Sequence, residues 1–260
     1  MDLALTGKNV LITGASQGIG AGIAMAFAKE GCALTLTARS TEKLATLRDQ
    51  IISNYDVQVS LIAADLTIAD DLAKILSQSG DIDILVNNAG SIPAGTLADL
   101  DPAQWRSGWD LKLFGYINLT RAFFARMKLQ GHGVIINNIG NSGEVFDSNY
   151  IAGSTGNAAL MAFTRTIGAF SLDAGIRVVG VNPGPVDTDR IRMMLEKRAA
   201  ALLGATDRYI ELLARYPQKR VATVQEVADL ILFLASERAS YICGTIITLD
   251  GGISSRRAQI

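Results

Sequence analysis

Asn9-Val10-Leu11-Ile12-Thr13-Gly14-Ala15-Ser16-Gln17-Gly18-Ile19-Gly20 is the stretch that decides the fold of this chain. The apolar run over Asn9–Thr13 predicts a buried strand, and Gly18–Glu30 predicts a helix that Gly31 ends. Small residues between the two let the backbone approach a pyrophosphate, which the N–H groups and dipole of the helix N-terminus attract. The spacing is GxxxGxG, and no Lys-Ser or Lys-Thr pair follows, so a Walker P-loop is excluded. The stretch therefore predicts a strand–turn–helix unit that binds a dinucleotide.

The rest of the chain repeats this alternation of strands and helices without a linker. Strands are predicted at 33–37, 57–63, 82–87, 134–137, 177–182 and 245–249, and helices at about 67–78 and 149–172 and from about residue 41. Ser40 is expected to cap one helix, and Asp101-Pro102 to begin another that runs towards Leu129. This alternation predicts an α/β fold, a single doubly wound Rossmann domain over residues 1–260 with about seven parallel strands and helices on both faces.

A long segment from Asp187 to about Tyr216 interrupts the alternation, and such insertions at the carboxyl ends of strands often form lids. The stretch from Arg190 to Arg220, which covers most of this segment and a few residues after it, holds eight basic and three acidic residues. This excess of positive charge favours an anionic substrate, although a solvated helical face is the alternative.

Composition excludes several classes of protein. A hydrophobic fraction of 49% and a charged fraction of 19% indicate a compact enzyme rather than a disordered chain. The net charge of -1 provides no field for nucleic acid or anionic lipid, and neither a signal peptide nor a membrane span is recognised, so we expect a cytoplasmic protein. Cys32 and Cys243 form no CxxC pair, and we expect two buried thiols and no metal site.

Five motifs in order resemble those of the short-chain dehydrogenase/reductase family. They are the glycine turn at 13–20, Asp65-Leu66, the NNAG sequence at 87–90, the PGxVxT-like sequence at 183–188, and Leu249-Asp250-Gly251-Gly252. The resemblance implies a nicotinamide dinucleotide site formed by Gly14, Ser16, Gln17, Gly18, Ile19, Gly20, Asp65, Leu66, Asn87, Ala89, Gly90, Pro183, Gly184, Val186 and Thr188. It also implies a homo-oligomer, a tetramer or a dimer.

The end of the second predicted strand bears on the choice of cofactor. An acid there would bind the ribose hydroxyls of NAD, but this chain has Ala38 followed by Arg39. A guanidinium suits a 2′-phosphate, so we expect NADP(H), with NAD(H) less favoured. The second basic residue often present in the glycine motif is absent, because position 17 is Gln, and an exposed Arg39 without a role is the alternative.

The catalytic positions depart from the family pattern. The resemblance implies a tyrosine as general acid/base, a lysine four residues later that lowers its pKa and holds the ribose, and an asparagine on the preceding helix. Tyr150 matches the tyrosine and is expected to contact the cofactor, but Ser154 stands at the lysine position and Lys112 at the asparagine position. We expect Ser154 to donate to a ribose hydroxyl and Lys112 to supply the missing charge. The alternative is a Lys112 that reaches solvent or a nearby carboxylate in a chain that has lost activity.

The family serine that polarises the carbonyl has no clear counterpart. Counting from Gly133 leads to Gly140, and counting back from Tyr150 leads to Asn137, neither of which is a hydroxyl residue. Ser142 is the first candidate to replace it, ahead of Asn138 and Asn141, although all three could equally be turn residues.

Three functions follow. The favoured one is an NADP(H)-dependent oxidoreductase acting on a small carbonyl or alcohol substrate, with an anionic substrate favoured and with Tyr150 as acid/base. The second is a non-catalytic dinucleotide-binding protein, a redox sensor or assembly partner, which the missing lysine and serine favour. The third is an enzyme of another class that uses the nucleotide structurally.

Overall fold

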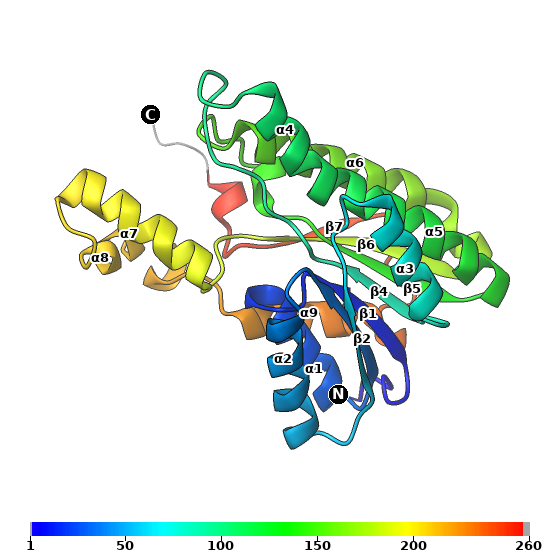
Figure 1. The fold of residues 1–260 in the computed structure, drawn as a ribbon. Helices are drawn as coiled ribbons and strands as arrows, with labels where there is room; N and C mark the ends of the chain where they lie inside the picture. The colour runs from blue at the N-terminus through cyan, green and yellow to red at the C-terminus, as the bar shows by residue number, and fades with distance from the viewer. Residues whose placement is uncertain (1, 257–260) are drawn as a thin grey trace.

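The computed structural model describes residues 2–256 and contains one sheet of seven parallel strands in the order β3-β2-β1-β4-β5-β6-β7 (Figure 1). The predicted α/β architecture is confirmed, and every predicted strand is present with its ends within two residues of the expected positions. The strands are β1 Asn9–Thr13, β2 Ala33–Ala38, β3 Val59–Ala63, β4 Ile84–Asn87, β5 Gly133–Asn138, β6 Ile176–Pro183 and β7 Ile246–Leu249.

The strand order reverses at β1, which pairs with β2 on one side and β4 on the other. The chain therefore leaves the two neighbouring strands in opposite directions, and their carboxyl ends border a crevice between the connections. The turn after β1 and the loop after β4 meet there. This switch point is where an open α/β sheet positions its ligand.

Helices cover both faces of the sheet (Figure 1). In β1, Val10 and Ile12 join the core under one set of helices, while Leu11 joins the core under the other, as the alternation of side chains along a strand requires. The first set is α1 Gly18–Lys29, α2 Thr41–Asn54 and α9 Val224–Ala235; the second is α3 Ala69–Gln78, α4 Pro102–Trp109, α5 Gly115–Gln130 and α6 Ile151–Ser171. The sequence predictions did not include α9.

The helix expected from Asp101 towards Leu129 begins as predicted, because Asp101 caps α4 through Ala103 and Gln104. It is not one continuous α-helix, which corrects the sequence reading. Residues Asp110–Phe114 form a π-helical turn, η1, before α5 continues the path. Such turns often occur at functional sites, and this one holds Lys112.

The segment expected as a lid forms α7 Asp189–Leu203 and α8 Tyr209–Leu213, which extend away from the sheet in Figure 1 (yellow). Leu195, Ala199 and Leu212 make a small core of their own within this pair. The helices can therefore keep their packing if the pair shifts relative to the sheet, and their role as a lid stays a prediction.

Neither a membrane-spanning helix nor a metal site is expected from the sequence. Among residues 2–256, no helix is long and apolar enough to cross a membrane, and no group of three or more metal-ligating side chains is found. Cys32 is buried as expected, and burial raises the pKa of its thiol to about 12. Cys243 is only half-buried, so the prediction of two buried thiols is wrong for that residue.

Candidate active site

The glycine turn after β1 leaves no room for side chains. A Cβ on Gly14 would lie 2.7 Å from the Cα of Ala89, and a Cβ on Gly20 would lie 2.2 Å from the carbonyl oxygen of Gly14. Gln17, which precedes α1, makes no side-chain cap, so the first N–H groups of α1 are not occupied by that residue. An N-terminus of this kind binds a phosphate through backbone donors, and the turn fits a dinucleotide.

Asn88 ties the glycine turn to the loop after β4. Its Nδ2 donates to the carbonyl oxygens of Thr13 at 3.0 Å and Gly14 at 3.3 Å, and its Oδ1 accepts from Nδ2 of Asn138 at 2.8 Å. Three neighbouring strand ends are thus joined by two amides. The sequence analysis did not include Asn88, although it lies inside the NNAG motif.

Asn87, the residue that is expected to bind the cofactor, is 0% exposed, and its Nδ2 donates to Oγ1 of Thr120 and Oδ1 of Asn137. Its Oδ1 has no partner among the described residues, and its contact with the cofactor stays a prediction. Asn137 also donates from Nδ2 to Oγ1 of Thr164, so both ends of its amide are bonded, which counts against Asn137 as a counterpart of the family serine.

The loop after β6 also reaches the glycine turn. A Cβ on Gly18 would lie 3.5 Å from Cγ2 of Thr188, and Thr188 caps α7 through the N–H of Ile191. Gly184 lies against Asp250, where a Cβ would be 2.8 Å from the Asp250 Cβ. The glycine turn, the NNAG loop and the PGxVxT-like loop are therefore brought together at the carboxyl edge of the sheet, as the sequence predicts.

The opposite end of the expected dinucleotide site carries two basic side chains. Arg39 is exposed directly after β2. Lys43, in the first turn of α2, donates from Nζ to Oε1 of Gln17 at 2.9 Å and so lies beside the glycine turn. The sequence analysis noted that a second basic residue was missing there, and Lys43 supplies one from another element. Asp65 binds Thr67 through Oδ1, and Leu66 is buried beside it.

Tyr150 stands immediately before α6, and its ring folds back over the first turn of that helix. A Cβ on Gly153 would lie 2.0 Å from Cε1 and 2.1 Å from Cζ of Tyr150, so the ring fills the space that a side chain at 153 would need. The backbone around it is fixed by a hydrogen bond from Ile151 N to Gly95 O at 3.3 Å. The absence of a side chain at Gly153 thus determines where the phenol lies.

Ser154 is 4% exposed, and its Oγ accepts from the backbone N–H of Asp147 at 3.2 Å. The hydroxyl therefore helps to hold the loop before α6, and the expected contact between Ser154 and the cofactor ribose stays a prediction.

Asn157 lies one turn further along α6 and was not predicted as a site residue. It contacts Ser142, the first candidate to replace the family serine. Its Nδ2 donates to Oγ of Ser142 at 2.7 Å and to the carbonyl oxygen of Gly140 at 3.3 Å. Because Ser142 Oγ accepts this bond, its own proton is left to donate elsewhere. Asn157 is 2% exposed, and its Oδ1 has no partner among the described residues. A buried amide directly after Gly156, at the start of an apolar helix, is the signal that could have identified it.

Lys112 crosses from the π-helical turn to the end of β5. Its stem packs against Gly90, where a Cβ would lie 2.9 Å from Cδ of Lys112, and its Nζ donates to the carbonyl oxygen of Ile139. Burial, together with repulsion from Arg190, lowers the pKa of Lys112 to about 7. The expectation that this side chain turns inward is thereby favoured over the alternative that it reaches solvent.

Tyr116, one helical turn after Lys112, binds the adjacent carbonyl oxygen. Its hydroxyl donates to Asn138 O at 2.9 Å. Burial raises the pKa of Tyr116, and the nearby charge of an ionised Tyr150 raises it further. An ionised Tyr150 therefore lies within electrostatic range of Tyr116, one of the two side chains that bind the end of β5.

Known proteins are similar to this chain along nearly its whole length. Residues 14–254 match the family described as enoyl-(acyl carrier protein) reductase. The chain is 31% identical to the 3-oxoacyl-[acyl-carrier-protein] reductase FabG of Escherichia coli, over 95% of this chain and 97% of that protein. It is 32% identical to dehydrogenase/reductase SDR family member 6 of Aquarana catesbeiana, over 96% and 98%.

The chain belongs to the short-chain dehydrogenase/reductase family. A solved member of similar structure is L-sorbose reductase from Gluconobacter frateurii complexed with NADPH and L-sorbose, with a TM-score of 0.92 and 30% identity over 99% of this chain and 100% of that one. The protein is thus an NAD(P)-dependent oxidoreductase of this family that acts on carbonyl or alcohol substrates.

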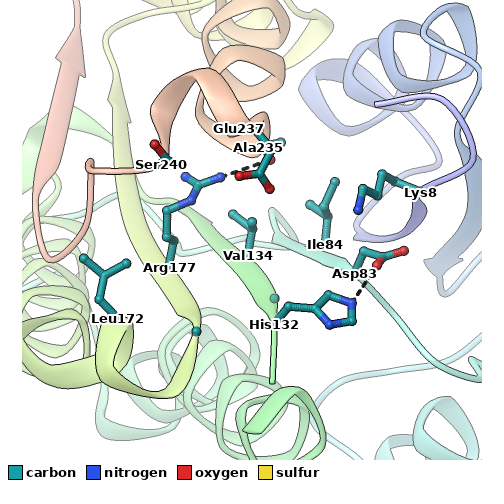
Figure 2. Close-up of a pocket in the computed structure, with 12 residues that line it drawn as sticks. Lys8, Asp83, Ile84, His132, Val134, Leu172, Arg177, Ala235, Glu237 and Ser240 are labelled. Carbon is teal, nitrogen blue, oxygen red and sulfur yellow. Dashed lines mark hydrogen bonds and ion pairs between the residues drawn. The ribbon is translucent and has the colours of Figure 1, made fainter. Parts of the chain in front are cut away.

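A cavity of about 220 Å³ lies at the other end of the strands, away from the family site (Figure 2). His132 borders it and contacts Oδ1 of Asp83 at 3.0 Å, and Arg177 binds the last carbonyl oxygens of α9. His132 precedes β5, whereas Ile139 and Ser142 follow it. His132 is therefore a loop residue at the opposite end of β5 from the candidate chemistry.

Proposed function

We propose that this protein is an NADP(H)-dependent oxidoreductase that transfers hydride between C4 of the nicotinamide and a carbonyl or secondary alcohol carbon. Tyr150 is the general acid/base, and Lys112 replaces the missing lysine of the YxxxK motif. The observation that carries the proposal is the path of Lys112, which runs over Gly90 of the NNAG loop to the carbonyl oxygen of Ile139.

The side chains support a division of roles. A positive charge on Lys112 favours the ionised form of a nearby phenol, and the effect is strong because the ammonium is shielded from water. Tyr150 in that form accepts a proton from an alcohol, and in its neutral form it donates one to a carbonyl oxygen. Ser142, which accepts from Asn157, has a free hydroxyl proton with which to polarise that oxygen.

NADP(H) is the proposed cofactor. The bound group would supply or receive the hydride at its nicotinamide, while the chain binds and orients it through the glycine turn. Arg39 and Lys43 support the choice because two cations border the site of a 2′-phosphate, and Lys43 is held beside the turn by Gln17. In the same family, L-sorbose reductase was solved with NADPH.

The catalytic roles are tested by NADPH oxidation with a panel of small carbonyl compounds. Tyr150→Phe is expected to lower kcat by ~100-fold or more while NADPH affinity is kept, because a positioned acid/base contributes that much. Lys112→Met should also lower kcat. The control is Lys128→Met, which removes a lysine that is exposed on α5. A fully active Tyr150→Phe enzyme would refute the assignment, and NADPH binding without turnover of any carbonyl would favour the non-catalytic alternative.

The cofactor is tested by titrating the protein with NADPH and NADH. We expect the Lys43→Met and Arg39→Ala variants each to weaken NADPH binding by up to tenfold, about 1.4 kcal/mol, and to leave NADH binding unchanged. Arg48→Ala is the control on the same helix, since Arg48 pairs with Asp49. Equal losses of NADPH affinity and NADH affinity would show that these two cations do not bind the 2′-phosphate.

The chain is also proposed to form a homo-oligomer. Phe170 on α6 is 78% exposed and Tyr241 before β7 is 94% exposed, and apolar groups of this size are often covered in an assembly. Light scattering on the purified protein would detect a dimer or tetramer, and a monomer at micromolar concentration would contradict the proposal.

A further inference from the structure

We propose that Lys112 and Arg190 together bind an oxyanion carried by the substrate, so that the preferred carbonyl or alcohol compound bears a carboxylate or similar group close to its reacting carbon. The proposal rests on the function proposed above and specifies its substrate class.

The two cations approach the same short loop from different elements. Lys112 comes from the π-helical turn and lies against Gly90. Arg190 is the second residue of α7, and its Nη2 donates to the carbonyl oxygen of Ile92 at 3.4 Å. Gly90 and Ile92 are two residues apart in the loop after β4. This loop is therefore contacted by Lys112 from the π-helical turn and by Arg190 from α7.

Neither cation has an acidic partner among residues 2–256. Arg192, two residues after Arg190, is paired with Asp187 at 3.7 Å, whereas no ion pair is formed by Arg190 or Lys112 in the described part of the chain. Among the described residues, the charge that acts on the pKa of Lys112 is that of Arg190, which repels it. Two cations that approach one loop without a counter-ion form a ready site for an anion.

The position of the pair relates it to the reacting groups. Nζ of Lys112 lies at the carbonyl oxygen of Ile139, and Ser142, the proposed donor to the substrate carbonyl, follows three residues later. An oxyanion at the cations would therefore lie beside the carbonyl of the same small molecule. The anion would also cancel the repulsion between the cations and keep Lys112 protonated, the state in which it stabilises ionised Tyr150. Neutral carbonyl compounds would lack this effect.

The probe is oxalate, compared with oxamide as a neutral molecule of similar shape, titrated calorimetrically into the protein saturated with NADPH. We expect oxalate to bind at least tenfold more tightly than oxamide. Arg190→Gln should weaken oxalate binding by tenfold or more, and Arg192→Gln, the matched control, should change it by less than twofold. At pH 8, titrations in buffers of different ionisation enthalpy should show proton uptake on oxalate binding in the wild type and none in Lys112→Met.

Three outcomes would overturn the inference. The first is equal binding of oxalate and oxamide, and the second is an equal loss in Arg190→Gln and Arg192→Gln. The third is an unchanged oxalate affinity in Arg190→Gln together with a tenfold loss of NADPH affinity, which would assign the cations to the cofactor's own phosphates. Oxalate binding does not require turnover, so an oxalate site in a protein that reduces no carbonyl would leave this site in place and refute the catalytic proposal instead.

Discussion

The glycine turn and the region around Tyr150 lie at the same edge of the sheet but are built in different ways. The turn is made of backbone, and its geometry permits no Cβ at Gly14 or Gly20. Around Tyr150, long side chains cross between elements, and Lys112 reaches Ile139 from another helix. A site made of backbone fixes its own sequence, whereas a site made of long side chains can obtain the same charge from a different position. The glycine turn therefore keeps the family spacing, while the replacement of a family lysine by Lys112 near Tyr150 stays a prediction.

The largest effect that would sharpen this comparison is expected for Gly20→Ala. Its Cβ would lie 2.2 Å from the carbonyl oxygen of Gly14, which is backbone and cannot yield. We expect NADPH affinity to fall by at least ~100-fold, about 2.7 kcal/mol, with a lower free energy of unfolding measured in urea.

Gly18→Ala provides the matched comparison. Its Cβ would meet Thr188 at an ordinary 3.5 Å, but its φ of 56° is left-handed and disfavours alanine by roughly 1–2 kcal/mol. Its loss should be smaller than that of Gly20→Ala. The reverse order would show that backbone conformation, and not close packing, selects glycine in the turn.

The sequence predicts this backbone region well, for a physical reason. Strand periodicity, helix capping at Ser40 and glycine spacing are local properties, and all were confirmed. The sequence did not predict which asparagine of the NNAG pair turns inward, because neighbouring residues of a strand end face opposite sides and the motif contains both. Lys43 was missed because it comes from a different helix than the turn it approaches.

The second prediction concerns Gly153→Ala. In an ordinary helix interior this change stabilises by roughly 0.5–1 kcal/mol. Here the new Cβ would lie 2.0 Å from Cε1 of Tyr150, so the ring must leave its position. We expect kcat with the best carbonyl substrate to fall by ~10–100-fold, since the acid/base would be displaced, while NADPH affinity stays within twofold.

Thr155→Ala, an exposed position on the same turn of α6, is the control and should keep its activity. A Gly153→Ala enzyme as active as the wild type would show that the position of the Tyr150 ring does not matter for catalysis.

Less of this second region could be predicted. Tyr150 and Lys112 were identified from their positions in the chain, but their surroundings depend on a π-helical turn that leaves no mark in the hydrophobic pattern. Ser154 was placed at the cofactor by spacing alone, whereas its hydroxyl bonds the loop before α6. Asn157 went unnoticed because its role is defined by its contact with Ser142, which only the folded chain brings near.

The last prediction concerns stability and tests how far Lys112 departs from a surface lysine. Its pKa is lowered from 10.5 to about 7 in the folded protein. Below pH 7 both the folded and unfolded chains hold this proton, and the cost of burying the charge is fully present. Between pH 7 and about 10.5 the unfolded chain holds a proton that the folded chain has released, so the free energy of unfolding rises with pH.

Urea unfolding is therefore measured at pH 7, 8 and 9. The free energy of unfolding of the wild type should rise relative to that of Lys112→Met by up to about 1.4 kcal/mol per pH unit. Lys128→Met, which removes an exposed lysine of the same helical path, should run parallel to the wild type across this range. If the Lys112→Met curve is also parallel, the ammonium is solvated and its charge is weak at Tyr150. The region around Tyr150 would then differ from the glycine turn not by relocating its lysine but by lacking one.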